Sequence, residues 1–134
     1  MIRILQIQIF ARFYKCFEAS GLTPVNYAIL VTIRDNPAVT QSELAGVLKL
    51  QLPNLVKILS KMEDAGTLKR KRSVKDKRAV ELSLTKLGLK KTSEAVASGD
   101  LFNAQTLAAL SKHEQVAFLQ MLARLVESHK SAAA

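Results

Sequence analysis

Apolar residues recur at a helical spacing along most of this chain. The spacing of three or four positions is typical of a helix with one packed face, and it occurs in residues 2–19, 24–34, 41–48, 52–64, 85–110 and 112–128. Residues 68–84 differ, because Val80, Leu82 and Leu84 alternate with polar neighbours as in a strand. The pattern predicts a mainly α fold with one small β-hairpin.

Short-range signals mark where several of these helices begin and end. Thr23 with Pro24, and Thr40 with Glu43 three residues later, are typical of helix N-termini, where a side-chain oxygen caps free backbone N–H groups. Gly66 stands where a helix C-terminus requires positive φ. The helix over 52–64 should therefore end after residue 65, immediately before the hairpin.

Residues 52–64 have an apolar side for packing and a polar side that is free to bind. Pro53 suits the first helical turn, so we expect the helix to begin near Gln51. The apolar side consists of Leu52, Leu55, Val56, Leu59 and Met62.

Asn54, Lys57 and Lys61 form a single ridge on the polar side, at positions i, i+3 and i+7. Asn can pair with adenine through two hydrogen bonds, and Lys can reach guanine or phosphate. The ridge predicts a DNA-reading helix, although an ordinary amphipathic helix with a solvated polar face fits the same residues.

Lysine and arginine residues are concentrated in the predicted hairpin, which carries much of the formal net charge of +9. Only Asp76 opposes them, and we expect its carboxylate to orient the guanidinium of Arg78. A hairpin tip of this charge beside an exposed helix is typical of contact with a phosphate backbone. The cations are Lys69, Arg70, Lys71, Arg72, Lys75, Lys77 and Arg78.

The helices over 41–48 and 52–64 follow one another across a short turn, as in a helix-turn-helix, whose first helix crosses the DNA backbone while the second enters the major groove. The first helix would offer hydroxyls, an amide and free N–H groups to phosphate. The residues expected at DNA are Thr40, Gln41, Ser42, Gln51, Pro53, Asn54, Lys57, Lys61, Arg70, Arg72, Lys75, Asp76, Lys77 and Arg78.

Motifs along the whole chain resemble the MarR-type winged helix-turn-helix regulators. The resemblance implies that Arg78 enters the minor groove, and that the Leu-Thr-x-x-Gly string opens the long helix after the wing. Val56 and the Leu52-Pro53 entry depart from the family pattern. The matching residues are Leu22, Thr23, Pro24 and Tyr27; Gln41, Leu44 and Ala45; Lys61, Met62, Glu63, Gly66, Leu68 and Arg70; and residues 76–80, 82–85 and 88.

With 134 residues, the chain is expected to form one MarR-like domain over 1–134. Residues 23–84 would make the winged helix-turn-helix, and residues 1–20 and 86–130 the dimerisation helices. The apolar stripes on these outer helices exceed what one such chain can cover, which favours a homodimer. Two-fold symmetry then predicts a pseudo-palindromic operator with half-sites roughly 34 Å apart.

No catalytic constellation occurs, so we expect neither an enzyme nor a cofactor. His113 and His129 lack ligands at zinc spacing. The lone Cys16 excludes an internal disulfide, and we expect it to be buried packing rather than an oxidant sensor. The apolar runs are shorter than a membrane helix requires, and no signal core occurs, which favours a cytoplasmic protein.

Arg12, Tyr14 and Tyr27 are candidates for a small-molecule site. The resemblance implies an aromatic or phenolic effector where the dimer helices meet the winged helix, and these side chains would supply a cation, two hydroxyls and apolar walls. The alternative is that both tyrosines only pack. The sequence as a whole favours a sequence-specific DNA-binding regulator, a repressor by preference, over a non-specific architectural DNA-binding protein or a protein-interaction module.

Overall fold

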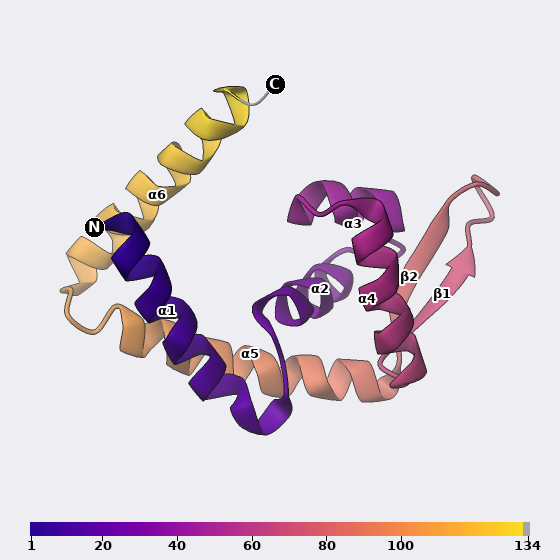
Figure 1. The fold of residues 1–134 in the computed structure, drawn as a ribbon, viewed down its shortest axis with the longest axis horizontal. Coiled ribbons are helices and arrows are strands. Elements are labelled where there is room, and N and C mark those ends of the chain that lie inside the picture. Colours follow the sequence, from indigo (N-terminus) through magenta and orange to yellow (C-terminus); the bar gives the residue numbers. More distant parts are fainter. Residues whose placement is uncertain (133–134) are drawn as a thin grey trace. The chain divides into compact units, whose positions relative to one another are not determined.

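The computed structural model describes residues 1–132, with side chains as far as residue 128. Figure 1 shows helices in most of the chain and one hairpin. The elements in order are α1 (Ile2–Phe17), the 3-10 helix η1 (Glu18–Ser20), α2 (Pro24–Asp35), α3 (Gln41–Leu48), α4 (Leu52–Asp64), β1 (Leu68–Arg72), β2 (Val80–Leu84), α5 (Lys86–Thr106) and α6 (Lys112–Ala132).

Two compact units, Met1–Asp100 and Leu101–Ala134, divide the chain. The first contains α1 to α4, the hairpin and most of α5, and the second contains the end of α5 and α6. One domain over 1–134 stays a prediction, as does the dimerisation role of the outer helices.

An apolar core holds α2, α3, α4 and the hairpin together. One face of α4 enters it through Leu55, Leu59 and Met62, while β1 and β2 contribute Leu68 and Leu82. The remaining core members are Ile29, Leu30, Ile33, Val39, Leu44 and Ala45. The structure confirms a mainly α fold with a β-hairpin wing in a winged helix-turn-helix arrangement. Leu52 was predicted on the packed side of this helix, but it is 41% exposed in the first turn of α4, so that part of the prediction is wrong.

The predicted caps are present. Thr23 accepts a hydrogen bond from the Asn26 N–H at 3.1 Å, and Pro24 occupies the first turn of α2. At α3, Thr40 and Glu43 form a reciprocal capping box. Gly66 has φ +72°, which lets the chain leave α4 and turn into β1. These bonds join residues at most three positions apart, which explains why sequence alone could predict them.

The wing is an antiparallel pair in which Leu68 lies opposite Leu84 and Arg72 opposite Val80. The segment before α3 lies along β2, because the Leu82 N–H donates to the Val39 carbonyl at 2.9 Å. The hairpin is thereby tied to the helix-turn-helix as well as to its own partner strand.

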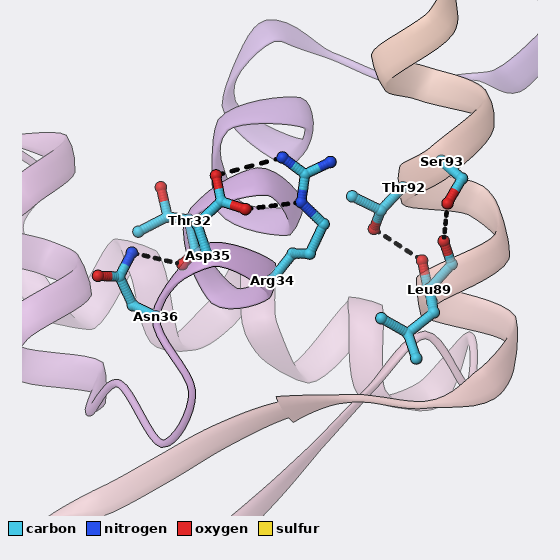
Figure 2. A network of polar contacts seen from close by, with 8 residues as sticks. Thr32, Arg34, Asp35, Asn36, Leu89, Thr92 and Ser93 are labelled. Carbon is cyan, nitrogen blue, oxygen red and sulfur yellow. Dashed lines mark hydrogen bonds and ion pairs between the residues drawn. The ribbon is translucent and has the colours of Figure 1, made fainter.

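Figure 2 labels residues at the end of α2 and in α5, where some side chains donate to carbonyls four residues earlier in the chain. At the end of α2, the side chain of the C-cap residue Asn36 donates to the Thr32 carbonyl at 2.9 Å. In α5, the hydroxyl of Thr92 donates to the Gly88 carbonyl at 2.7 Å, so a fully buried polar group is satisfied within its own helix.

The structure corrects the predicted bounds of the last two helices. α5 ends at Thr106 rather than near 110, and it runs unbroken through Gly99. α6 continues to Ala132, beyond the end expected near 128. The sequence offers residues 131–134 no anchor, which predicts fraying there; residues 131–132 are helical, and residues 133–134 lie outside the described residues.

Candidate nucleic-acid interface

The turn between α3 and α4 sets the angle of the helix-turn-helix. Lys49 adopts the left-handed conformation with φ +54°, and the Leu50 N–H donates to the Ala45 carbonyl at 3.0 Å. The chain then enters α4 at Gln51, which makes no side-chain cap. Gln51 and Pro53 are both exposed at this end of the helix, where major-groove entry was predicted.

The predicted ridge of α4 is free to meet a partner. Asn54, Lys57 and Lys61 are all exposed, while Leu55 and Leu59 on the opposite side are fully buried. The core therefore fixes the rotation of α4 about its axis, and the ridge is held away from the core.

The beginning of α3 is less open to phosphate than the sequence suggested. The Thr40 hydroxyl donates to a Glu43 carboxylate oxygen at 2.9 Å and accepts from the Glu43 N–H at 3.2 Å. Hydrogen bonds from Thr40 also lower the pKa of Glu43, so a carboxylate charge lies beside that hydroxyl. Ser42 is exposed and Gln41 is half-buried.

A network of main-chain contacts shapes the wing tip. The Ser73 hydroxyl, which is buried, accepts from the N–H groups of Lys75 at 3.2 Å and Asp76 at 3.4 Å. The Ala79 N–H donates to the Asp76 carbonyl at 2.9 Å. Sequence reasoning missed Ser73, although a Ser two or three residues before a turn is a known turn signal.

Asp76 acts differently from the prediction. Its carboxylate accepts a hydrogen bond from the backbone N–H of Arg78 at 2.9 Å. The ion pairs of the described side chains, Arg34–Asp35 and Arg70–Glu63, do not include one between Asp76 and Arg78. An Asp bonds readily to the main chain two residues on, so Asp76 fixes the turn, and the Arg78 guanidinium is left exposed at the tip.

The cations of the wing separate into two groups. Arg70 is held by Glu63 of α4, with Arg70 Nε donating to Glu63 Oε2 at 2.8 Å, so it is not an open contact residue as the sequence suggested. The others project from the strands or the tip. The exposed cations of the wing are Lys69, Lys71, Arg72, Lys75, Lys77 and Arg78.

A cavity of about 910 Å³ lies within residues 1–100. Tyr14, Lys61 and Lys91 are among its lining residues, so one of its cations belongs to the exposed ridge of α4. Of the three residues predicted for a small-molecule site, the lining includes only Tyr14. Arg12 is exposed elsewhere on α1, and Tyr27 packs against aromatic rings.

Cys16 is exposed rather than buried, which corrects the prediction. Phe13 and Phe17 of α1 lie four residues apart on one buried side, and Cys16, one residue before Phe17, points about 100° away from it around the helix. Within the described residues no group of three His, Cys, Asp or Glu side chains could hold a metal ion. None of the described helices is long and apolar enough to cross a membrane.

Comparison with known proteins assigns this arrangement to one family. A sequence profile of the MarR family matches residues 22–80. The transcriptional regulator HosA of Escherichia coli is 30% identical over 111 residues, which make up 83% of this chain and 82% of HosA. The chain belongs to the MarR family. The similarity to HosA extends over most of this chain and most of HosA.

Other MarR-like regulators support the assignment. The HTH-type transcriptional repressor Mb2911 of Mycobacterium bovis is 33% identical over 107 residues, covering 78% of this chain and 76% of Mb2911. The solved structure of the transcriptional repressor CouR bound to a 23-mer DNA duplex is similar with a TM-score of 0.89 and 28% identity, over 93% of this chain and 89% of CouR. MarR-family proteins are transcriptional regulators and not enzymes, so this chain is a DNA-binding transcriptional regulator.

Proposed function

We propose that the protein is a homodimeric repressor that binds a pseudo-palindromic operator through the α4 ridge and the wing tip. The observation that carries the proposal is the exposure of Asn54, Lys57 and Lys61 on a helix whose opposite face is buried, next to a hairpin tip with Arg78 free. The similarity to CouR and Mb2911, both described as repressors, supports repression as the direction of control.

The individual contacts follow from side-chain chemistry. Asn54 and Lys57 can read base edges in the major groove, and Lys61 lies farther along the same ridge. Lys75, Lys77 and Arg78 at the tip can reach phosphate and the adjacent minor groove. The other predicted contacts remain Gln41, Ser42, Gln51, Pro53 and Arg72, with Thr40, Arg70 and Asp76 in supporting roles that their hydrogen bonds indicate.

Dimerisation accounts for exposed apolar side chains on α1 and α6. Ile2 is 83% exposed and Ile4 57% on α1, and Val116 and Val126 are each 56% exposed on α6. Apolar surface of this extent normally marks an interface. A two-fold dimer would present two winged helices to half-sites roughly 34 Å apart.

Selection of binding sites from random duplexes, followed by measured affinities, tests the proposal. The protein should bind a selected duplex at least about a thousandfold more tightly than a scrambled one at physiological salt, and it should sediment as a dimer at micromolar concentration. Equal affinity for both duplexes would indicate a non-specific architectural protein instead. A folded monomer that retains full operator affinity would contradict the dimer.

Single substitutions assign the contacts. Asn54→Ala should cost about 1–3 kcal/mol on the selected site and relax the preference at one base position. Arg78→Ala should lower operator affinity while the melting temperature stays unchanged, because this guanidinium has no packing role. Loss of affinity by Asn54→Ala on every sequence equally would show that Asn54 touches only phosphate.

An anionic aromatic effector is the proposed occupant of the cavity near Tyr14. The volume of about 910 Å³ lies in the range of small-molecule sites, and Lys61 and Lys91 can pair with a carboxylate or phenolate. An anion on Lys61 would compete with DNA for the same ammonium group, and a coupling of about 1–3 kcal/mol would release DNA by 5- to 150-fold.

Thermal-shift screening of aromatic acids, with operator affinity measured for each hit, tests the effector. Lys91→Ala should weaken the binding of a hit, and Arg12→Ala should not, because Arg12 lies outside the cavity lining. Hits that stabilise the protein without changing operator affinity would refute the switch. Hits that depend on Arg12 and not on Lys91 would place the site elsewhere.

A further inference from the structure

Glu63, in the last turn of α4, holds the first strand of the wing with both oxygens of its carboxylate. Oε1 accepts from the backbone N–H of Arg70 at 3.1 Å, and Oε2 accepts from Arg70 Nε at 2.8 Å. Arg70 Nη2 lies 2.6 Å from the same Oε2. Paired charged hydrogen bonds of this kind fix orientation as well as distance. They also lower the pKa of Glu63 from its ordinary value.

The position of this pair makes it a joint between the two DNA-binding elements. α4 and β1 are separated by only three residues, and Gly66 between them has φ +72°. Arg70 is the middle residue of β1 and lies opposite Leu82 of β2. A side chain of α4 is therefore bonded to both the main chain and the side chain at the centre of the hairpin.

We propose that Glu63 and Arg70 are positioning residues that fix the angle of the wing relative to the DNA-reading helix, so that Arg78 reaches DNA when the α4 ridge is seated in the groove. The inference rests on the proposed contact of the wing tip with DNA. β1 ends at Arg72, and the chain turns at the tip beyond it; about five extended residues counted from Arg70 span roughly 17 Å. A change of about 10° at the joint would move the tip by about 3 Å, which is the length of a hydrogen bond.

If Glu63 positions the wing, its removal should change operator affinity in the direction opposite to that expected for removal of an acid near DNA. Removal of a carboxylate from a protein that binds a polyanion normally raises affinity, because repulsion of phosphate is lost. If Arg70 were a phosphate contact restrained by Glu63, loss of Glu63 would raise affinity further. If the pair positions the wing, the same loss lowers operator affinity although the net charge becomes more positive.

Asp64 provides a matched control, because it is the exposed acid next in sequence on α4. Operator affinity should fall about tenfold in Glu63→Ala and remain unchanged or rise in Asp64→Ala. Glu63→Gln preserves the shape of the side chain and should lie between wild type and Glu63→Ala. Circular dichroism and thermal melting check that each variant is folded. Equal operator affinity in Glu63→Ala and Asp64→Ala would overturn the proposal.

A double-mutant cycle separates positioning of the tip from general destabilisation. In the Arg78→Ala background, Glu63→Ala should lower operator affinity by a smaller factor than it does in the wild-type background, because one of the tip contacts that Glu63 positions is already absent. The slope of log affinity against log salt should fall by about one in Glu63→Ala, as expected for one lost contact.

The outcomes distinguish the two proposals. An unreduced effect of Glu63→Ala in the Arg78→Ala background, or a steeper salt slope in Glu63→Ala, would overturn the positioning role and leave the wing contact intact. If Arg78→Ala alone does not change operator affinity, the proposed wing contact is wrong, and the positioning role falls with it.

Discussion

Gly88, the third residue of α5, is the position where one added methyl group should be least tolerated. A Cβ at this site would overlap the Thr67 carbonyl oxygen and lie 2.9 Å from the Thr67 carbonyl carbon. Heavy atoms in favourable contact lie about 3.5–4.0 Å apart. The obstacle is main chain, so rotation of a side chain cannot relieve the overlap in Gly88→Ala.

Thr67 has little freedom to move away. Its hydroxyl and its N–H donate to the Met62 carbonyl at 2.7 and 3.0 Å, and its own carbonyl accepts from the Thr85 N–H at 3.1 Å. Overpacking costs about 1–3 kcal/mol, and loss of the Thr85 bond about 0.5–1.5 kcal/mol. The better helix propensity of Ala offsets about 0.5–1 kcal/mol of this. We expect Gly88→Ala to reduce the free energy of unfolding by about 2 kcal/mol, within a range of about 0.5–4.

Gly46→Ala is the matched control. Gly46 lies within α3, is exposed, and would have no heavy atom within 4 Å of an added Cβ. The substitution should stabilise the protein by about 0.5–1 kcal/mol, because Ala loses less backbone entropy in a helix. The same substitution of Gly by Ala should therefore lower the free energy of unfolding at Gly88 and raise it at Gly46.

Urea unfolding, followed by circular dichroism, measures both variants. One protein concentration must be used throughout, because the stability of a dimer depends on concentration. Similar denaturant slopes would indicate that the midpoints report stability rather than a change in the unfolded state. A Gly88→Ala protein as stable as wild type would refute the reasoning, and equal losses in Gly88→Ala and Gly46→Ala would show that contact with Thr67 is irrelevant.

Three other substitutions extend the test to the backbone, a cap and pH. Ala38 has φ +62° and is exposed, so Ala38→Gly should leave stability unchanged or raise it by up to about 1 kcal/mol in urea unfolding; a clear loss would contradict strain at this residue. Thr40→Ala removes the α3 cap and should lower stability by about 1 kcal/mol with an unchanged denaturant slope; unchanged stability would show that the capping box is dispensable. The pKa of Glu63 is lowered from 4.5 by its bond to Arg70, so its contribution is present above pH 4.5 and is lost as pH falls through the lowered value. Glu63→Gln should therefore be less stable than wild type at pH 7, by an amount that shrinks in acid unfolding curves as the pH falls below 4.5; a constant difference across pH would rule out ionisation of Glu63 as the cause.

The sequence by itself determined the features that depend on neighbours along the chain. The Thr40 cap needs only Glu43 three residues later, and the turn at Gly66 needs only a residue that tolerates positive φ. The polar ridge of α4 follows from helical periodicity, since burial of Leu55 and Leu59 exposes the opposite side. The cationic hairpin could be located because its charges lie between alternating apolar residues.

Only the tertiary structure decided which of these polar groups are free and which are held. Arg70 looks like its cationic neighbours in the sequence, yet the turn at residues 65–67 brings it onto Glu63. Periodicity cannot predict that contact, because it depends on the angle between a helix and a strand.

The cavity was decided in the same way, by packing among elements far apart in the sequence. Its lining combines α1, α2, α4 and the middle of α5, and includes Lys91 in place of the predicted Arg12. Tyr27 is drawn instead into contact with Phe13 and Phe17, at ring-centroid distances of 6.0 and 5.4 Å. Local spacing fixes which side of a helix a residue occupies, but burial of the shared core fixes what that side meets, because the core selects one arrangement of the helices among the many that the same amphipathic patterns allow.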